Sequence, residues 1–124
     1  MLLAVYIGLA GAAGSVSRHL VGLGLARYSG RLPWGTFAVN IIGSMLIGFV
    51  MAMFASRGEL DSKLRFALTT GFLGGFTTYS AFALESVGML EDKKLGLAAV
   101  YVGLTFVGAA AGCWLGLVSG RALR

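Results

Sequence analysis

Residues 71–85, GFLGGFTTYSAFALE, combine helix-breaking residues with groups that can contact an ion. Gly74 and Gly75 interrupt an uncharged run that is long enough to cross a bilayer core, which needs about 20 apolar residues. Each glycine costs a helix interior roughly 1 kcal/mol relative to alanine, and Thr77 and Thr78 add smaller penalties. In hydrocarbon, backbone groups freed by a break survive only if protein buries them or if they line a cavity or ion site. The segment therefore predicts a broken membrane-spanning helix and indicates transport.

A polar stripe follows one face of another apolar segment, where Thr36, Asn40 and Ser44 recur every four residues. A polar group buried without a partner costs roughly 1–3 kcal/mol or more, so these residues are candidates for function. Asn40 lies too deep to reach a lipid headgroup. Its position predicts either a hydrogen bond to another helix or a donor directed at an ion, and the sequence favours neither.

Aromatic and polar side chains recur at helical spacing on two further segments. Tyr79, Phe82 and Glu85 fall on one face just beyond the predicted break. Tyr101 and Thr105 share a face near the start of the last apolar segment. Rings at such spacing usually pack between helices, but their edges carry partial positive charge and can also contact an anion. The rings therefore predict packing or, if a pore is present, part of its wall.

Composition places the chain in a membrane. Hydrophobic residues make up 57% of the sequence and charged residues 12%, and the mean hydropathy is +0.85. Four uncharged windows are long enough to span a bilayer: residues 1–17 (extendable past Arg18 to residue 26), 32–56, 66–84 and 95–120. We therefore predict an all-α membrane protein, with a single domain over residues 1–124 that contains four transmembrane helices.

Basic residues are divided equally between the two sides that four spans would define. One side holds Arg57, Lys63, Arg65, Arg121 and Arg124, and the other holds Arg18, Arg27, Arg31, Lys93 and Lys94. Orientation normally follows an excess of Lys and Arg in cytoplasmic loops, so this balance predicts insertion in both orientations. A single orientation remains the alternative if Arg18 does not act as a loop charge. The net charge of +5 indicates pairing with lipid headgroups rather than with nucleic acid, because no basic run has interleaved aromatics.

Glycine spacing predicts close helix packing. Gly108, Gly112, Gly116 and Gly120 recur every four residues, and Gly8, Gly11 and Gly14 cluster in the first span. Small residues at this spacing let helix backbones approach closely in lipid. Four helices enclose little space by themselves, so we expect an oligomer, and the balanced charges favour an antiparallel homodimer.

Three motifs resemble those of the Fluc/CrcB fluoride channels. They are GAAGSVSR at residues 11–18, GTFAVNIIG at residues 35–43 and GFLGGFTTYSAFALE at residues 71–85, in the order and spacing of that family. The third motif is highly specific, and the similarity covers nearly the whole chain. The resemblance implies a passive channel, highly selective for fluoride over chloride, which exports the ion through two separate pores of a dual-topology antiparallel homodimer.

The resemblance also implies roles for individual residues. A structural sodium ion on the two-fold axis would be held by the backbone carbonyls of Gly74 and Thr77 from each subunit. Asn40 would donate its amide to fluoride, and Tyr79 and Phe82 would occupy the positions of the paired pore-lining phenylalanines. The remaining positions are a polar track, Ser80, Tyr101 and Thr105, and a possible charged vestibule, Arg18 and Glu85. The chain departs from the family pattern at Tyr79, Ala81 and Ala109, so its polar track is thinner.

Fluoride chemistry is compatible with these residues. Fluoride is the smallest halide and a strong hydrogen-bond acceptor, so a pore must replace its water with donors such as amides and hydroxyls. A full charge in the pore would bind the ion too tightly to release it. A sodium ion beside the pore adds a favourable field without blocking the path.

Three other classes fit less well. A proton-coupled small multidrug or guanidinium exporter is also a four-helix, dual-topology protein, but it needs an acidic residue in the first span, which here offers only Arg18 and His19. A non-transporting membrane protein leaves the broken helix without a purpose. An enzyme is not expected, because no nucleophile, base and orienting group converge, and the single cysteine, Cys113, is interpreted as a small apolar residue.

The balanced charges and the lack of a targeting peptide favour a bacterial inner membrane.

Overall fold

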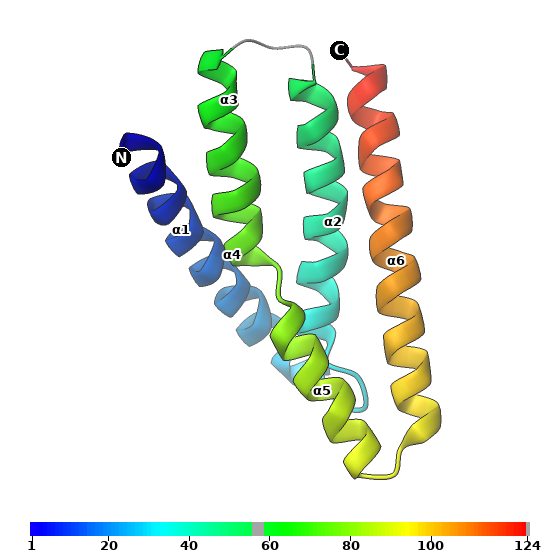
Figure 1. The fold of residues 1–124 in the computed structure, drawn as a ribbon. Coiled ribbons are helices and arrows are strands. Elements are labelled where there is room, and N and C mark those ends of the chain that lie inside the picture. The colour runs from blue at the N-terminus through cyan, green and yellow to red at the C-terminus, as the bar shows by residue number, and fades with distance from the viewer. Residues whose placement is uncertain (56–58, 124) are drawn as a thin grey trace.

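The computed structural model describes residues 1–55 and 59–123, and within these ranges every regular element is a helix. The elements, shown in Figure 1, are α1 (Leu2–Leu25), η1 (Ala26–Tyr28), α2 (Trp34–Phe54), α3 (Glu59–Phe66), η2 (Ala67–Leu73), α4 (Gly74–Phe76), α5 (Tyr79–Glu91) and α6 (Leu95–Ala122). The all-α prediction is confirmed. Ser56, Arg57 and Arg124, which the sequence analysis placed in a span or in the charge count, lie outside the described residues.

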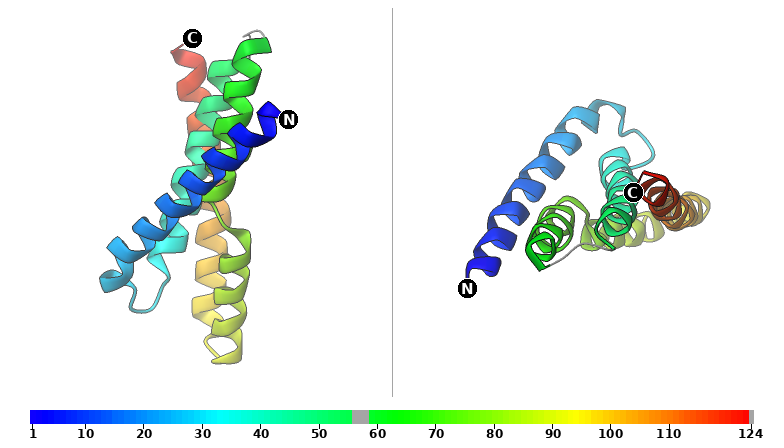
Figure 2. Two further views of the ribbon diagram at one scale, coloured as in Figure 1. Left: turned by 90° about the vertical axis from the view of Figure 1, so that its left-hand side faces the viewer. Right: turned by 90° about the horizontal axis from the view of Figure 1, so that it is seen from above.

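Helices α2 and α6 pack along each other and form the most extensive contact of the fold. On the other side of α2, α1 crosses against η2 and α4, and Figure 2 shows this diagonal crossing from two directions. α3, η2 and α4 occupy one half of the length of the molecule, and α5 continues into the other half beside α6 (Figure 1). The chain segment between α4 and α5 therefore lies near the middle of the molecule.

Within residues 1–55 and 59–123, two helices, α2 and α6, are long and apolar enough to cross a membrane. The third predicted span is divided among the shorter elements α3, η2, α4 and α5. Many large apolar side chains are more than half exposed, including those of Leu9, Phe106 and Trp114. So much exposed apolar surface would favour aggregation in water, whereas in a bilayer it contacts lipid. The fold is therefore that of a membrane protein.

The predicted helix break is present, but it does not occur at the glycines. Gly74 and Gly75 both lie within α4, and Gly74 has helical angles of φ −61° and ψ −39°. The chain leaves the helix at Thr77 (φ −86°, ψ 160°) and Thr78 (φ −149°, ψ 119°). The prediction that the glycines interrupt the helix is wrong, because both lie within a helix and Gly75 packs closely against α1. A methyl group on Gly75 would overlap the backbone carbonyl oxygen of Gly11.

Glycines at both helix contacts confirm the predicted role in packing. A methyl group on Gly48 of α2 would overlap the carbonyl oxygen of Cys113 in α6, and one on Gly116 would overlap that of Met45. Gly8, in contrast, has no neighbouring atom within 4 Å of where its Cβ would lie. The predicted packing role therefore holds for most of the periodic glycines but not for Gly8.

Replacement of Gly14 by alanine should destabilise the docking of α1. Gly14 is buried, and an added Cβ would overlap the carbonyl oxygen of Phe72, a backbone atom that cannot move away without shifting η2. Overpacking of this kind costs about 1–3 kcal/mol. The matched control is Gly8→Ala, which should leave stability unchanged or slightly increased. The measurement is unfolding in mixed micelles, and equal effects of the two substitutions would contradict the packing argument.

Candidate functional site at the helix break

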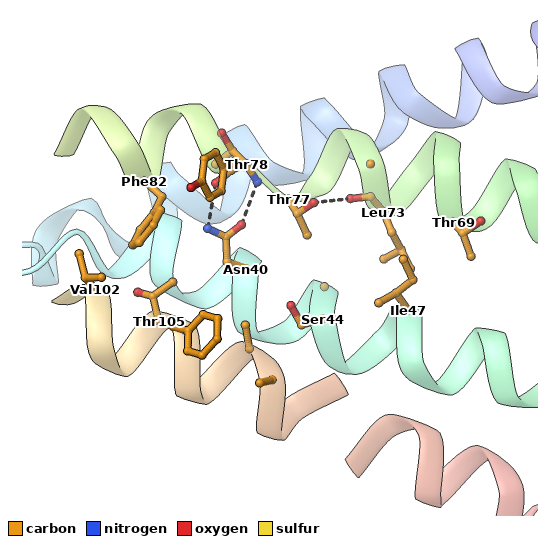
Figure 3. A pocket seen from close by; sticks show the side chains of 16 residues that line it. Asn40, Ser44, Ile47, Thr69, Leu73, Thr77, Thr78, Phe82, Val102 and Thr105 are labelled. Carbon is orange, nitrogen blue, oxygen red and sulfur yellow. Dashed lines mark hydrogen bonds between the residues drawn. The ribbon is translucent and has the colours of Figure 1, made fainter. Parts of the chain in front are cut away.

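Asn40 of α2 holds the break with both ends of its amide. Its Nδ2 donates to the carbonyl oxygen of Thr78 at 2.9 Å, and the backbone N–H of Thr78 donates to its Oδ1 at 2.8 Å (Figure 3). The two bonds together fix the amide orientation, since reversing it would place donor against donor and acceptor against acceptor. The predicted interhelical hydrogen bond of Asn40 is thus confirmed, and its partner is the unwound backbone itself.

At the break, side-chain oxygens accept hydrogen bonds from backbone N–H groups that would donate to backbone carbonyls in a continuous helix. In such a helix the N–H of Thr78 would donate to the carbonyl of Gly74, but it donates to Asn40. The N–H of Ala81 would likewise donate to the carbonyl of Thr77, but it donates to Oγ1 of Thr78, the N-cap of α5, at 3.2 Å. The carbonyls of Gly74 and Thr77 are therefore without their helical donors. Oxygen atoms of this kind are the ligands that hard cations prefer.

Thr77 is fixed by its other polar groups. Its N–H and its Oγ1 both donate to the carbonyl oxygen of Leu73, at 3.0 Å and 2.9 Å. Its methyl group lies where a Cβ on Gly43 would be, so α2 approaches the break closely at this point. The carbonyl oxygen of Thr77 accepts a hydrogen bond of 2.9 Å from Nη1 of Arg18, which reaches the break from α1 and is half-buried.

A cavity of about 720 Å³ opens beside the break, as Figure 3 shows. Its lining includes several residues singled out in the sequence: Asn40, Ser44, Gly74, Thr77, Tyr79, Phe82 and Thr105. Ser80 and Tyr101, which were expected on a polar track, do not line it. Ser80 is exposed and lies 3.4 Å from the Thr78 hydroxyl, whereas Tyr101 is buried. The cavity therefore gathers most, but not all, of the predicted site.

Phe82 lies between two tyrosine rings. Its centroid is 5.9 Å from that of Tyr79 and 5.3 Å from that of Tyr101, with tilted planes in both pairs. Tyr79 is 82% exposed, so one member of the pair predicted from the sequence faces outward from the single chain. The three rings form a continuous aromatic row from the exposed side of the break to the α5–α6 contact.

The carboxylate of Glu85 is bound by two hydroxyl groups. Thr36 of α2 donates to Oε1 at 2.7 Å, and Tyr101 of α6 donates to Oε2 at 2.6 Å. The spacing of the sequence singles out Glu85 but does not connect it with these two residues. Arg18, which was paired with it as a possible vestibule, contacts the break instead. The sequence carries a weak indication that Thr36 and Glu85 belong to the site, because Thr36 precedes Asn40 by one helical turn and Glu85 follows Phe82 by three residues.

Thr105 combines burial with an unused polar group. The residue is only 6% exposed, and its Oγ1 has no hydrogen-bond partner within the described part of the chain. Buried hydroxyls are nearly always satisfied by protein, water or a ligand. Because Thr105 also lines the cavity, its hydroxyl is available to something that enters there. One turn later the lining continues with Ala109, which offers no polar group.

Comparison with known proteins identifies the family. A family model described as "CrcB-like protein, Camphor Resistance (CrcB)" matches residues 5–117. A relative from Agrobacterium fabrum is 45% identical over 118 residues, which cover 94% of each chain. A relative from Bordetella petrii is 46% identical over 122 residues (98% of this chain, 92% of the relative), and one from Geobacter sulfurreducens is 41% identical over 118 residues (94% and 95%).

Each of these three relatives carries the name "Fluoride-specific ion channel FluC". The names describe ion channels, and they agree with the expectation that the chain is not an enzyme. The resemblance found in the three sequence motifs is confirmed by a match that runs almost from end to end. The chain belongs to the CrcB-like protein family.

Proposed function

We propose that this chain forms a passive, highly selective fluoride channel that exports fluoride across a bacterial inner membrane. The cavity beside the helix break carries this proposal. Its lining offers amide and hydroxyl donors and aromatic rings, and none of the lining residues bears a carboxylate, ammonium or guanidinium group. A fixed positive charge would hold an anion too tightly for rapid release, and a negative one would repel it. Neutral donors allow an anion to bind and leave.

Two donors in the cavity are available to the anion. The Nδ2 of Asn40 carries two hydrogens and gives one to Thr78, so the second remains for fluoride. The hydroxyl of Thr105 supplies another. Fluoride is a stronger acceptor than chloride, so a path made of such donors favours fluoride. The rings of Tyr79 and Phe82 would present their positive edges where the ion has lost part of its water.

The functional unit in this proposal is an antiparallel homodimer with four spans in each chain and two pores. The cavity supports a second copy, because its lining includes the strongly exposed rings of Tyr79 and Phe106, which are 82% and 74% accessible in the single chain. Another chain would cover these rings and complete the walls. The equal division of basic residues between the two predicted sides supports the antiparallel arrangement.

A structural sodium ion fits the freed carbonyls of the break. The carbonyls of Gly74 and Thr77 would hold it, since neither receives its helical N–H donor. Two copies that meet at their breaks would bring four such oxygens together. The ion would supply a fixed positive charge near the fluoride path.

A proton-coupled small multidrug or guanidinium exporter is the alternative. It requires a carboxylate in the first span to bind protons and cations in turn. All five acidic residues of this chain follow residue 58 in the sequence, so α1 has none. Glu85, the acidic residue near the cavity, is engaged by the hydroxyls of Thr36 and Tyr101. We therefore favour the channel.

Fluoride efflux from proteoliposomes tests this choice. Vesicles loaded with potassium fluoride should release fluoride when valinomycin provides a path for potassium, and vesicles loaded with chloride should retain it. Neither a proton gradient nor a sodium gradient should be needed. Release that stops when the proton gradient is collapsed would contradict passive conduction, and no release beyond that of empty liposomes would reject the channel.

Dual topology predicts that each loop is found on both sides of the membrane. Single cysteines introduced at Lys63 and at Lys93, in a Cys113→Ala background, should react with a membrane-impermeant reagent from either side in comparable amounts. Lys63 lies in α3 and Lys93 in the α5–α6 connection, and both are exposed. Labelling of each position from one side only would reject dual topology.

A further inference from the structure

Arg18 is a charged residue within α1 whose partner at the break is neutral. Its Nη1 donates to the carbonyl oxygen of Thr77 at 2.9 Å, and none of the ion pairs among the described residues involves it. Glu85, the nearest acidic residue in sequence to the break, is bound to hydroxyl groups instead. A charge inside a membrane-spanning segment is costly and usually marks a functional position. The placement of this guanidinium therefore needs an explanation beyond charge pairing.

The shape of the break does not depend on Arg18. Thr77 is tied to Leu73 through both its N–H and its hydroxyl, and Thr78 is tied to Asn40 through both its N–H and its carbonyl. The hydroxyl of Thr78 also caps α5. With these hydrogen bonds in place, Arg18 adds two things only: it occupies one lone pair of the Thr77 carbonyl, and it brings a positive charge beside it.

We propose that Arg18 competes with the bound cation at the Thr77 carbonyl and sets the affinity of the break for sodium. This inference rests on the proposed sodium site. A carbonyl oxygen has two lone pairs, so the guanidinium and a sodium ion can share it, but the two like charges repel each other. Arg18 thereby weakens cation binding, and it keeps the freed carbonyl hydrogen-bonded when no cation is present.

Sodium binding to the purified wild-type and variant dimers tests the proposal. Binding of ²²Na⁺ is measured in detergent at constant ionic strength, with N-methyl-D-glucamine chloride replacing sodium chloride. Arg18→Gln keeps a donor but removes the charge, and it should lower the dissociation constant for sodium roughly tenfold, as expected for loss of a close, partly screened like charge. Arg18→Lys keeps the charge and should remain within about twofold of wild type. Arg27→Gln is the matched control, because that guanidinium stacks over Tyr28 beyond the end of α1.

A histidine at the same position provides a second test within one protein. In Arg18→His, the ring should be mostly charged at pH 5.5 and mostly neutral at pH 8.5, since free histidine titrates near 6.5. Sodium should bind more tightly at the higher pH in this variant, and the change should exceed that of wild type. This comparison does not require the glutamine variant to fold.

The outcomes separate the two proposals. If wild type binds sodium but Arg18→Gln binds it equally or more weakly, the role of Arg18 is wrong and the sodium site stands. If sodium binding to Arg18→His depends on pH no more than binding to wild type does, the role of Arg18 is also wrong and the sodium site stands. If wild type shows no saturable sodium binding, the sodium site itself is wrong and the role of Arg18 falls with it.

Discussion

Aspartate in place of Asn40 should abolish fluoride transport. The carboxylate has no hydrogen to donate, so it loses the bond to the Thr78 carbonyl and places two acceptors against each other. It also puts a negative charge on the wall of the proposed anion path. An aspartate inside a membrane costs about 2.5–3.5 kcal/mol, and a barrier raised by that amount lowers the rate by roughly 100-fold or more. Fluoride efflux from liposomes, expressed per folded protein, measures the effect.

Ser44→Ala is the matched control for this substitution. Ser44 lies one turn beyond Asn40 on the same stripe of α2 and lines the same cavity, but it does not bind the break. Its replacement should change the flux far less than Asn40→Asp does. Normal fluoride flux in a folded Asn40→Asp protein would contradict the role of this amide.

Isoleucine in place of Phe82 should reduce fluoride flux by roughly two- to tenfold. Phe82 lines the cavity and lies between Tyr79 and Tyr101, so its ring is held in a fixed orientation by aromatic neighbours on both sides. Isoleucine retains most of the bulk and removes the positive ring edge, which is worth roughly 0.5–1.5 kcal/mol in contacts of this kind. The measurement combines efflux with the elution of the protein in size-exclusion chromatography.

Tyr79→Phe is the control for the aromatic row. It preserves the ring, restores the residue that the family pattern has at this position, and removes a hydroxyl from a side chain that is mostly exposed in the single chain. Its effect on flux should be mild. If the rings only pack between helices, Phe82→Ile will lower stability and leave the flux per folded protein near wild type, and the pore assignment will be wrong.

The broken helix could be predicted from the sequence, but its location could not. Glycine and β-branched residues mark a weak helix, and their position within an uncharged run indicated the break. The residues that actually leave the helix are Thr77 and Thr78, and Asn40 on another helix bonds both the N–H and the carbonyl of Thr78. Such partners depend on tertiary structure. Gly75 instead packs against α1, a contact that the spacing of residues within one segment cannot reveal.

The hydrogen-bond partners of Glu85 could not be predicted from the sequence either, because they too depend on tertiary structure. Its face of α5 was evident from the spacing with Phe82, but its two donors come from α2 and α6, which are distant in sequence. The role of Arg18 was open for the same reason, since a carbonyl acceptor leaves no trace in the amino-acid pattern. Most of the candidate pore residues were identified because polar groups are rare in apolar spans, and rarity can be read directly from the sequence.

The reversal potential of the purified protein in planar bilayers tests the central claim most directly. With a fluoride gradient across the membrane and equal chloride, proton and sodium concentrations on both sides, the current should reverse at the equilibrium potential of fluoride. Adding a chloride gradient or a proton gradient should not move it, because a passive fluoride-selective pore couples to neither. A reversal potential that follows the chloride gradient would contradict selectivity, and one that follows the proton gradient would contradict passive conduction.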